Sequence, residues 1–130
     1  MDKIDPRQYP AAVKECWCVH QALRALGFAS ENIYIAVGQD ERHPQFDAAL
    51  FVVLKAQGKE FIVTVGLYAS EAAADADVDQ WNAFAELSNE GAFDQKLLEE
   101  IYAASNVVQN KVAFATALVG KGIRPSQEGS

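Results

Sequence analysis

The run of seven apolar residues from 48 to 54 constrains the fold of this chain more than any other segment. It is far shorter than the roughly 20 residues that a membrane-spanning helix needs. A strand that is apolar at every position suits a sheet covered on both faces. We therefore expect residues 48–54 to form a strand whose two faces both need cover.

Two alternating segments flank this run and complete a predicted sheet. Apolar side chains at 33, 35 and 37 alternate along the segment before it, and residues 61–68 alternate after it. Residues 55–59 have the composition of a hairpin turn, in which Gly58 is free to take a positive φ. The simplest topology is a three-stranded antiparallel meander, with a polar loop at 38–46 between the first two strands.

Helices are expected on either side of this sheet. Before it, apolar residues spaced four and three apart predict a helix from about Pro6 or Pro10 to Leu26, ended by Gly27. After it, residues 70–77 are expected to be a loop or a short helical turn that leads to a helix capped by Asp77. One long helix should then run from residue 93 to about residue 119. This order predicts a single α+β domain over residues 1–122, with a frayed tail at 123–130.

The charge of the chain excludes some partners. Its 130 residues carry 11 basic and 18 acidic side chains, for a net charge of −7, which would repel nucleic acid and anionic membranes. The acidity is local, since residues 71–100 hold nine carboxylates and one lysine. The N-terminus lacks the residue order of a signal peptide, and we expect a cytoplasmic protein. We therefore expect neither nucleic acid nor membrane as a partner.

Two cysteines and a histidine form the densest group of possible metal ligands. Cys16 and His20 lie four residues apart on one helix face, but Cys18 falls nearly on the opposite side. A closed zinc site needs four ligands, and His43 is the one His or Cys left. A disulfide between Cys16 and Cys18 would close too small a ring, which favours a reducing compartment. We expect core packing here, no cofactor, and no activated thiol.

The loop at 38–46 holds the candidate catalytic residues. Asp40, Glu41, Arg42 and His43 supply two carboxylates, a guanidinium and an imidazole, which suffice for acid–base chemistry or for a polar ligand. Loops of this composition are more often simply solvated. A metal-dependent nuclease would need an acidic residue two positions before Lys55, where Val53 stands. No motif favours catalysis. The sequence therefore does not decide whether the protein is an enzyme, but it favours a protein without catalytic activity.

Two surfaces suggest partners. Trp17 points about 140° away from the inner stripe of the first helix, with Val13 and Arg24 beside it, as in an interface hot spot. Alternatively, a helix that follows the sheet covers this face. An exposed apolar patch of Tyr34, Ile62 and Tyr68 on the sheet would favour a homodimer.

The sequence thus leaves several functions open. The first is a non-catalytic protein-binding or assembly module that docks a basic or amphipathic partner on its acidic half. In size, charge and element order the chain is similar to bacterial secretion-chaperone-like domains, with no shared motif. The alternative is a small enzyme or ligand-binding domain that uses the loop 38–46, with a divalent metal or a thiol. A subunit of a larger assembly would look the same as the first.

Overall fold

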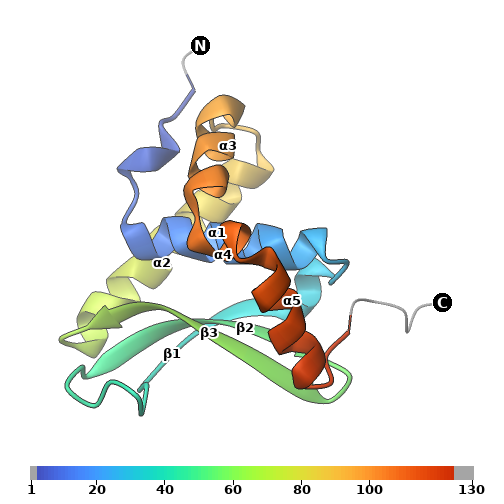
Figure 1. Cartoon of the computed structure of the whole chain (residues 1–130). Helices are drawn as coiled ribbons and strands as arrows, with labels where there is room; N and C mark the ends of the chain where they lie inside the picture. Colours follow the sequence, from blue (N-terminus) through green and yellow to red (C-terminus); the bar gives the residue numbers. More distant parts are fainter. Residues whose placement is uncertain (1–2, 125–130) are drawn as a thin grey trace.

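The computed structural model describes residues 3–124, without the side chains of residues 107 and 108, and arranges them in two layers (Figure 1). One layer is a three-stranded sheet. The other consists of helices that all lie on the same side of that sheet. The predicted α+β class and the order of helix, three strands and further helices are confirmed. None of the helices in residues 3–124 is both long and apolar enough to cross a bilayer.

The sheet is the predicted antiparallel meander. Its strands are β1 (Ile33–Gly38), β2 (Ala48–Ala56) and β3 (Lys59–Tyr68), and β2 lies in the middle. Gln57 and Gly58 join β2 to β3 with φ values of 57° and 75°, the positive values that a tight hairpin turn requires. The apolar run at 48–54 therefore occupies the central strand, as its composition predicts.

A bulge in β3 changes which side chains face the helices. Phe51 pairs with Thr64, but the preceding residue, Leu50, pairs with Gly66, so β3 carries one extra residue at this point. One extra residue moves every later side chain to the opposite face of the strand. The expectation that Tyr68 shares a patch with Ile62 is wrong for this reason, because Tyr68 packs into the core between sheet and helices.

The helix α1 (Ala11–Ala25) packs on the sheet with the predicted stripe. Its Cys16, Val19 and Leu23 are fully buried in one core with Leu50 and Leu54 of β2. Complete burial of a leucine side chain stabilises the fold by about 1.5–3 kcal/mol relative to exposure. This core fixes α1 against the inner face of the sheet.

A second, aromatic core lies on the opposite side of α1. Phe84 and Phe93 are buried there with ring centroids 4.5 Å apart, and Tyr9 meets Phe84 edge-on at 5.1 Å. Val13 of α1 is completely buried in the same cluster. The helix α1 therefore has two buried faces, one against the sheet and one against later helices.

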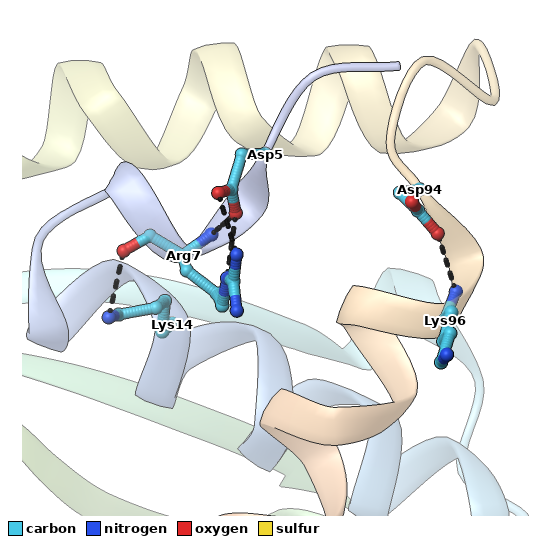
Figure 2. Close-up of polar contacts among 5 residues, drawn as sticks. All are labelled: Asp5, Arg7, Lys14, Asp94 and Lys96. Carbon is cyan, nitrogen blue, oxygen red and sulfur yellow. Dashed lines mark hydrogen bonds and ion pairs between the residues drawn. The ribbon is translucent and has the colours of Figure 1, made fainter. Parts of the chain in front are cut away.

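The N-terminal segment ties this second core together. Ile4 forms a parallel bridge with Phe93, and the Lys3 ammonium donates to the Gly91 carbonyl at 2.7 Å. Figure 2 shows two caps in this region. The Asp5 carboxylate accepts from the Arg7 backbone N–H at 2.9 Å, and Asp94 accepts from the N–H of Lys96 at 2.9 Å. Both side chains satisfy backbone donors that a helix start leaves free.

The helix α2 (Glu71–Asn89) starts earlier than expected. Ser70 is its N-cap, and the Ser70 Oγ accepts from the N–H of Ala73 at 3.2 Å. Asp77, the expected cap, lies inside the helix and accepts a hydrogen bond from the Tyr68 hydroxyl at 2.6 Å. The segment 70–77 is therefore helical, because alanine and glutamate favour a helix once a cap is present.

The expectation of one continuous helix at 93–119 is wrong. The chain forms α3 (Gln95–Ala104), α4 (Asn106–Gln109) and α5 (Lys111–Gly120) instead. Ser105 adopts extended backbone between α3 and α4, with φ −71° and ψ 135°. This break allows α3 to pack on α1 while the end of α5 reaches the sheet, where Leu118 and Ile123 are buried. Of the expected tail, Ile123 is thus part of the core, and residues 125–130 lie outside the described residues.

The cap of α2 gives a first prediction. Replacing Ser70 with Ala removes the hydrogen bond to the Ala73 N–H and should lower the free energy of unfolding by about 1 kcal/mol. Urea denaturation monitored by circular dichroism measures this change. Ser70→Asn is the control, because asparagine caps as well as serine and should restore most of the stability. Equal stability of Ser70→Ala and the wild type would contradict the assignment of the cap.

Candidate functional site

The loop 38–46 contains an ion pair between Asp40 and Arg42, and both residues hydrogen-bond to Thr64 of β3. The Asp40 carboxylate accepts from two nitrogens of the Arg42 guanidinium, each at 3.2 Å, from the Arg42 N–H at 3.0 Å, and from the Thr64 hydroxyl at 2.8 Å. Arg42 also donates to the Thr64 Oγ1 at 3.1 Å. Asp40 is buried, and these hydrogen bonds, first from Arg42 and then from Thr64, hold its pKa well below the usual range. Asp40 is therefore a fixed anion that fastens the loop to β3.

The four candidate catalytic residues are divided between two hollows. Arg42 and His43 line one of about 640 Å³ along β3, while Asp40, Glu41 and Arg42 line another of about 670 Å³ over the outer face of the sheet. Among the hydrogen bonds of the described residues, none joins the His43 side chain to Asp40 or Glu41. General acid–base catalysis needs a base within hydrogen-bonding reach of its partner. Asp40, Arg42 and Thr64 form a strap, that is, a set of hydrogen bonds that fastens the loop to the sheet. The loop does not place a base and its partner within reach for proton transfer.

The two cysteines are buried and not activated. Burial raises the pKa of Cys16 to about 12 and that of Cys18 to about 11. The Cys18 thiol points to the backbone carbonyl of Ile101 at 3.7 Å. A reactive thiol needs a lowered pKa and access to solvent, and neither cysteine has them.

His20 contacts a serine hydroxyl and an aromatic ring. Its Nε2 lies 3.1 Å from the Ser30 hydroxyl, and its ring lies 6.4 Å from that of Trp81. Burial lowers the pKa of His20, so the imidazole stays neutral at pH 7. Residues 3–124 contain no group of three or more His, Cys, Asp or Glu side chains placed to hold a metal ion. The Cys16 and His20 pair therefore gains no further ligand among them.

The three candidate partner-binding residues differ from one another in their exposure to solvent. Val13 is completely buried in the aromatic core, so it offers no surface to a partner. Trp17 is partly buried, with ring centroids 6.4 Å from Phe84 and 5.9 Å from Tyr102. Arg24 is exposed at the far end of α1. Helices that follow the sheet therefore cover one side of Trp17, which was the alternative expectation.

Trp17 and Arg24 nevertheless share an open groove between α1 and α3. The lining residues of each helix are spaced three and four apart, so they lie on one face of that helix. The two faces form the two walls of the groove. The groove has a volume of about 520 Å³ and is lined by Trp17, Gln21, Arg24 and Ala25 of α1 and by Gln95, Leu98, Glu99 and Tyr102 of α3. Its lining combines two aromatic rings and a leucine with polar and charged groups.

The indole N–H of Trp17 is an unusual feature of this groove. The Nε1 atom is buried and finds no hydrogen-bond acceptor among the described residues. A buried donor without an acceptor costs about 1–3 kcal/mol, so native proteins rarely keep one. Such defects gather at functional sites, where stability is not the sole requirement.

The outer face of α2 carries the acidity of the chain. Successive residues of a helix rotate by about 100°, which places five carboxylates within an arc of about 100°. This acidic stripe consists of Glu71, Asp75, Asp79, Glu86 and Glu90, all of them exposed. None of the five takes part in an ion pair with another described residue.

Residues of the groove and of the strap were missed by the sequence analysis. Leu98 and Tyr102 lie beside Trp17 because α3 packs on α1. The local sequence of either helix does not indicate that the two helices pack together. Thr64 meets Asp40 across the width of the sheet, 24 positions away. The position of Trp17 and Arg24 on the same side of the predicted helix was the local indication of this surface.

The raised pKa values of the thiols give a second prediction. At pH 8 the native protein should react with a thiol reagent such as Ellman's reagent far more slowly than the denatured protein, because thiolates react and both thiols are protonated and buried. Absorbance of the released product in native buffer and in guanidinium chloride measures both rates. Rapid modification of either cysteine in the native protein would show an activated thiol and would reopen a catalytic interpretation.

Comparisons of this chain with protein-family models, with curated proteins and with solved structures found no match. The function has to be argued from the geometry of the described residues. That geometry offers an aromatic groove between α1 and α3 and an acidic stripe on α2, while the candidate catalytic groups are either engaged in structural hydrogen bonds or kept apart.

Proposed function

We propose that this chain is a non-catalytic protein-binding module that takes a basic, amphipathic segment of a partner in the groove between α1 and α3. The observation that carries this proposal is the composition of the groove, in which Trp17, Leu98 and Tyr102 meet polar and charged side chains. Amphipathic helices bind in grooves of this kind by inserting a few apolar anchors. The groove thus suits a segment with one apolar face.

The aromatic side chains supply the apolar half of the recognition. Tryptophan and tyrosine dominate binding energy at protein interfaces because they bury a large area at a small entropic cost. The Trp17 and Tyr102 rings already pack edge to face at 5.9 Å, which fixes the wall of the groove before a partner arrives. A preformed wall lowers the ordering cost of association.

The carboxylates supply the charge preference. Glu99 lines the groove, Glu100 follows it, and both are exposed. The acidic stripe of α2 adds five more carboxylates to this half of the chain. A field of one sign speeds the approach of an oppositely charged partner and disfavours partners of the same sign. A basic segment is therefore favoured over an acidic one of equal hydrophobicity.

The same observations support the wider setting of this function. Holding an amphipathic segment of another protein is a chaperone-like task, and a subunit of a larger assembly would use the groove in the same way. Two free, buried cysteines suit a reducing compartment such as the cytoplasm. An enzyme or a metal-dependent ligand site finds less support, because Asp40 is bound to Arg42 and Thr64.

Binding of a defined peptide tests this function. A fluorescently labelled amphipathic helix of leucine and lysine should bind, and the same helix with glutamate for lysine should bind at least tenfold more weakly, as fluorescence anisotropy reports. Raising the salt from about 0.1 M to about 1 M shortens the Debye length from about 10 Å to about 3 Å and should weaken the basic peptide selectively.

A matched pair of variants locates the binding. Ala25→Phe places a ring in the groove from an exposed position and should weaken peptide binding about tenfold or more. Ala113→Phe makes the same change at an exposed position of α5 and should leave binding unchanged. If the basic and acidic peptides bind alike, the charge preference is wrong. If Ala25→Phe binds the basic peptide as well as the wild type does, the groove is not the site.

A further inference from the structure

The outer face of the sheet has no helix over it. The helices lie on the other side, as Figure 1 shows, although β2 is apolar on both faces. Tyr34 and Ile62 stand on the outer face on either side of Val53, with which both pair in the sheet. Their exposed fractions are 41% and 49%, high values for large apolar side chains in the middle of a sheet. Two large apolar side chains of the described fold are therefore left exposed on this face.

The chain covers this face only in part. The Tyr34 hydroxyl reaches the Glu60 carboxylate of β3 at 3.4 Å, so its ring crosses the sheet and buries Val53 to 5% exposure. Asp40 and Arg42 reach across the sheet to Thr64, which pairs with Phe51 near the middle of β2. Between these two crossings lies the hollow of about 670 Å³, with Phe51 in its lining. The outer face thus combines two protruding side chains with a hollow beside them.

The charge of the outer face differs from that of the helical side. Around the hollow lie the acidic Asp40, Glu41 and Glu60 and the basic Arg42 and Lys121, and Lys55 pairs with Glu60 on the same face. These three acidic and three basic groups cancel. On the helical side, residues 71–100 carry nine carboxylates and one lysine. Two copies that met through their helical sides would repel strongly, whereas two outer faces can meet without net repulsion.

We propose that a second copy of this chain binds the outer face of the sheet, forming a twofold-symmetric homodimer. In such a dimer the same patch serves both subunits, so Tyr34 and Ile62 of each copy enter the hollow beside Phe51 of the other. The partner is a second copy because this face is neutral and self-complementary, while a basic partner is drawn to the acidic helical side. The dimer covers the Tyr34 and Ile62 side chains that a single copy leaves exposed.

The positions of the charges specify the orientation of the two sheets. Lys55 and Glu60 lie near the β2–β3 turn, whereas Glu41 and Arg42 lie in the loop at the opposite end of the outer face. A twofold axis perpendicular to the strands brings the turn end of one copy over the loop end of the other. Lys55 then faces the second copy's Glu41, and Glu60 faces the second copy's Arg42. The same axis brings Tyr34 and Ile62 over the hollow.

Sedimentation velocity tests the dimer with one substitution and a matched control. The wild type at high-micromolar concentration should sediment with twice the chain mass. Ile62→Asp should weaken dimerisation by about a hundredfold or more, because the charge is buried once in each half of a symmetric interface. Val112→Asp places the same charge on α5, where the side chain is 81% exposed, and should leave the dimer intact.

Two outcomes would overturn the proposal. One is a wild-type protein that is monomeric at this concentration. The other is an Ile62→Asp variant that stays dimeric while its circular dichroism spectrum is native. A monomeric Ile62→Asp variant with a native spectrum, beside a dimeric Val112→Asp variant, supports it. If the Ile62→Asp variant loses the native spectrum, Tyr34→Lys is measured in its place. A folded Tyr34→Lys monomer supports the proposal, and a folded Tyr34→Lys dimer contradicts it.

A charge exchange tests the orientation. Lys55→Glu should weaken the dimer, because the new carboxylate faces the second copy's Glu41. Adding Glu41→Lys should restore the affinity, since the two opposite charges are exchanged across the interface. Both side chains are exposed, so neither substitution disturbs the core. A double variant no tighter than Lys55→Glu alone would exclude the perpendicular axis.

Discussion

The need to cover both faces of β2 governs the rest of this structure. Its inner face is covered by α1 and by Leu118 and Ile123 at the end of α5. Its outer face receives only the ring of Tyr34 and the strap of Asp40, Arg42 and Thr64. A sheet of three strands leaves an apolar central strand with few neighbours to shield it. The incomplete cover of the outer face is therefore the source of the proposed self-association.

The helix α1 joins two cores and places the groove. One face packs on the sheet through Leu23, and the other packs on the aromatic cluster through Val13. Trp17 sits at the edge of the second cluster, where α3 begins to separate from α1. The break at Ser105 sets this position, because a continuous helix would not bring α3 against α1 and Leu118 into the sheet core at the same time. The groove is thus a consequence of how two cores share one helix.

Charge separates the two proposed interactions. The acidic half attracts basic segments and repels copies of itself, while the neutral outer face of the sheet permits self-association. A dimer through the sheets would direct both acidic sides outward, one on each flank. Two grooves on one particle would bind a partner with repeated basic segments more tightly than either groove alone, because the second contact becomes intramolecular.

The amino-acid sequence by itself determined the fold class, the three strands, their meander order and the C-terminal end of α1, because these depend on local periodicity and on glycine at turns. It did not determine the start of α2, where Ser70 outcompetes Asp77 as a cap, or the break at Ser105. It placed Tyr68 on the wrong face, because a bulge is a property of two paired strands. Of the candidate sites, it identified Trp17 and Arg24 but not Leu98, Tyr102 or Thr64. These residues meet through contacts between distant segments, which only the tertiary structure decided, because side-chain packing and not local propensity selects them.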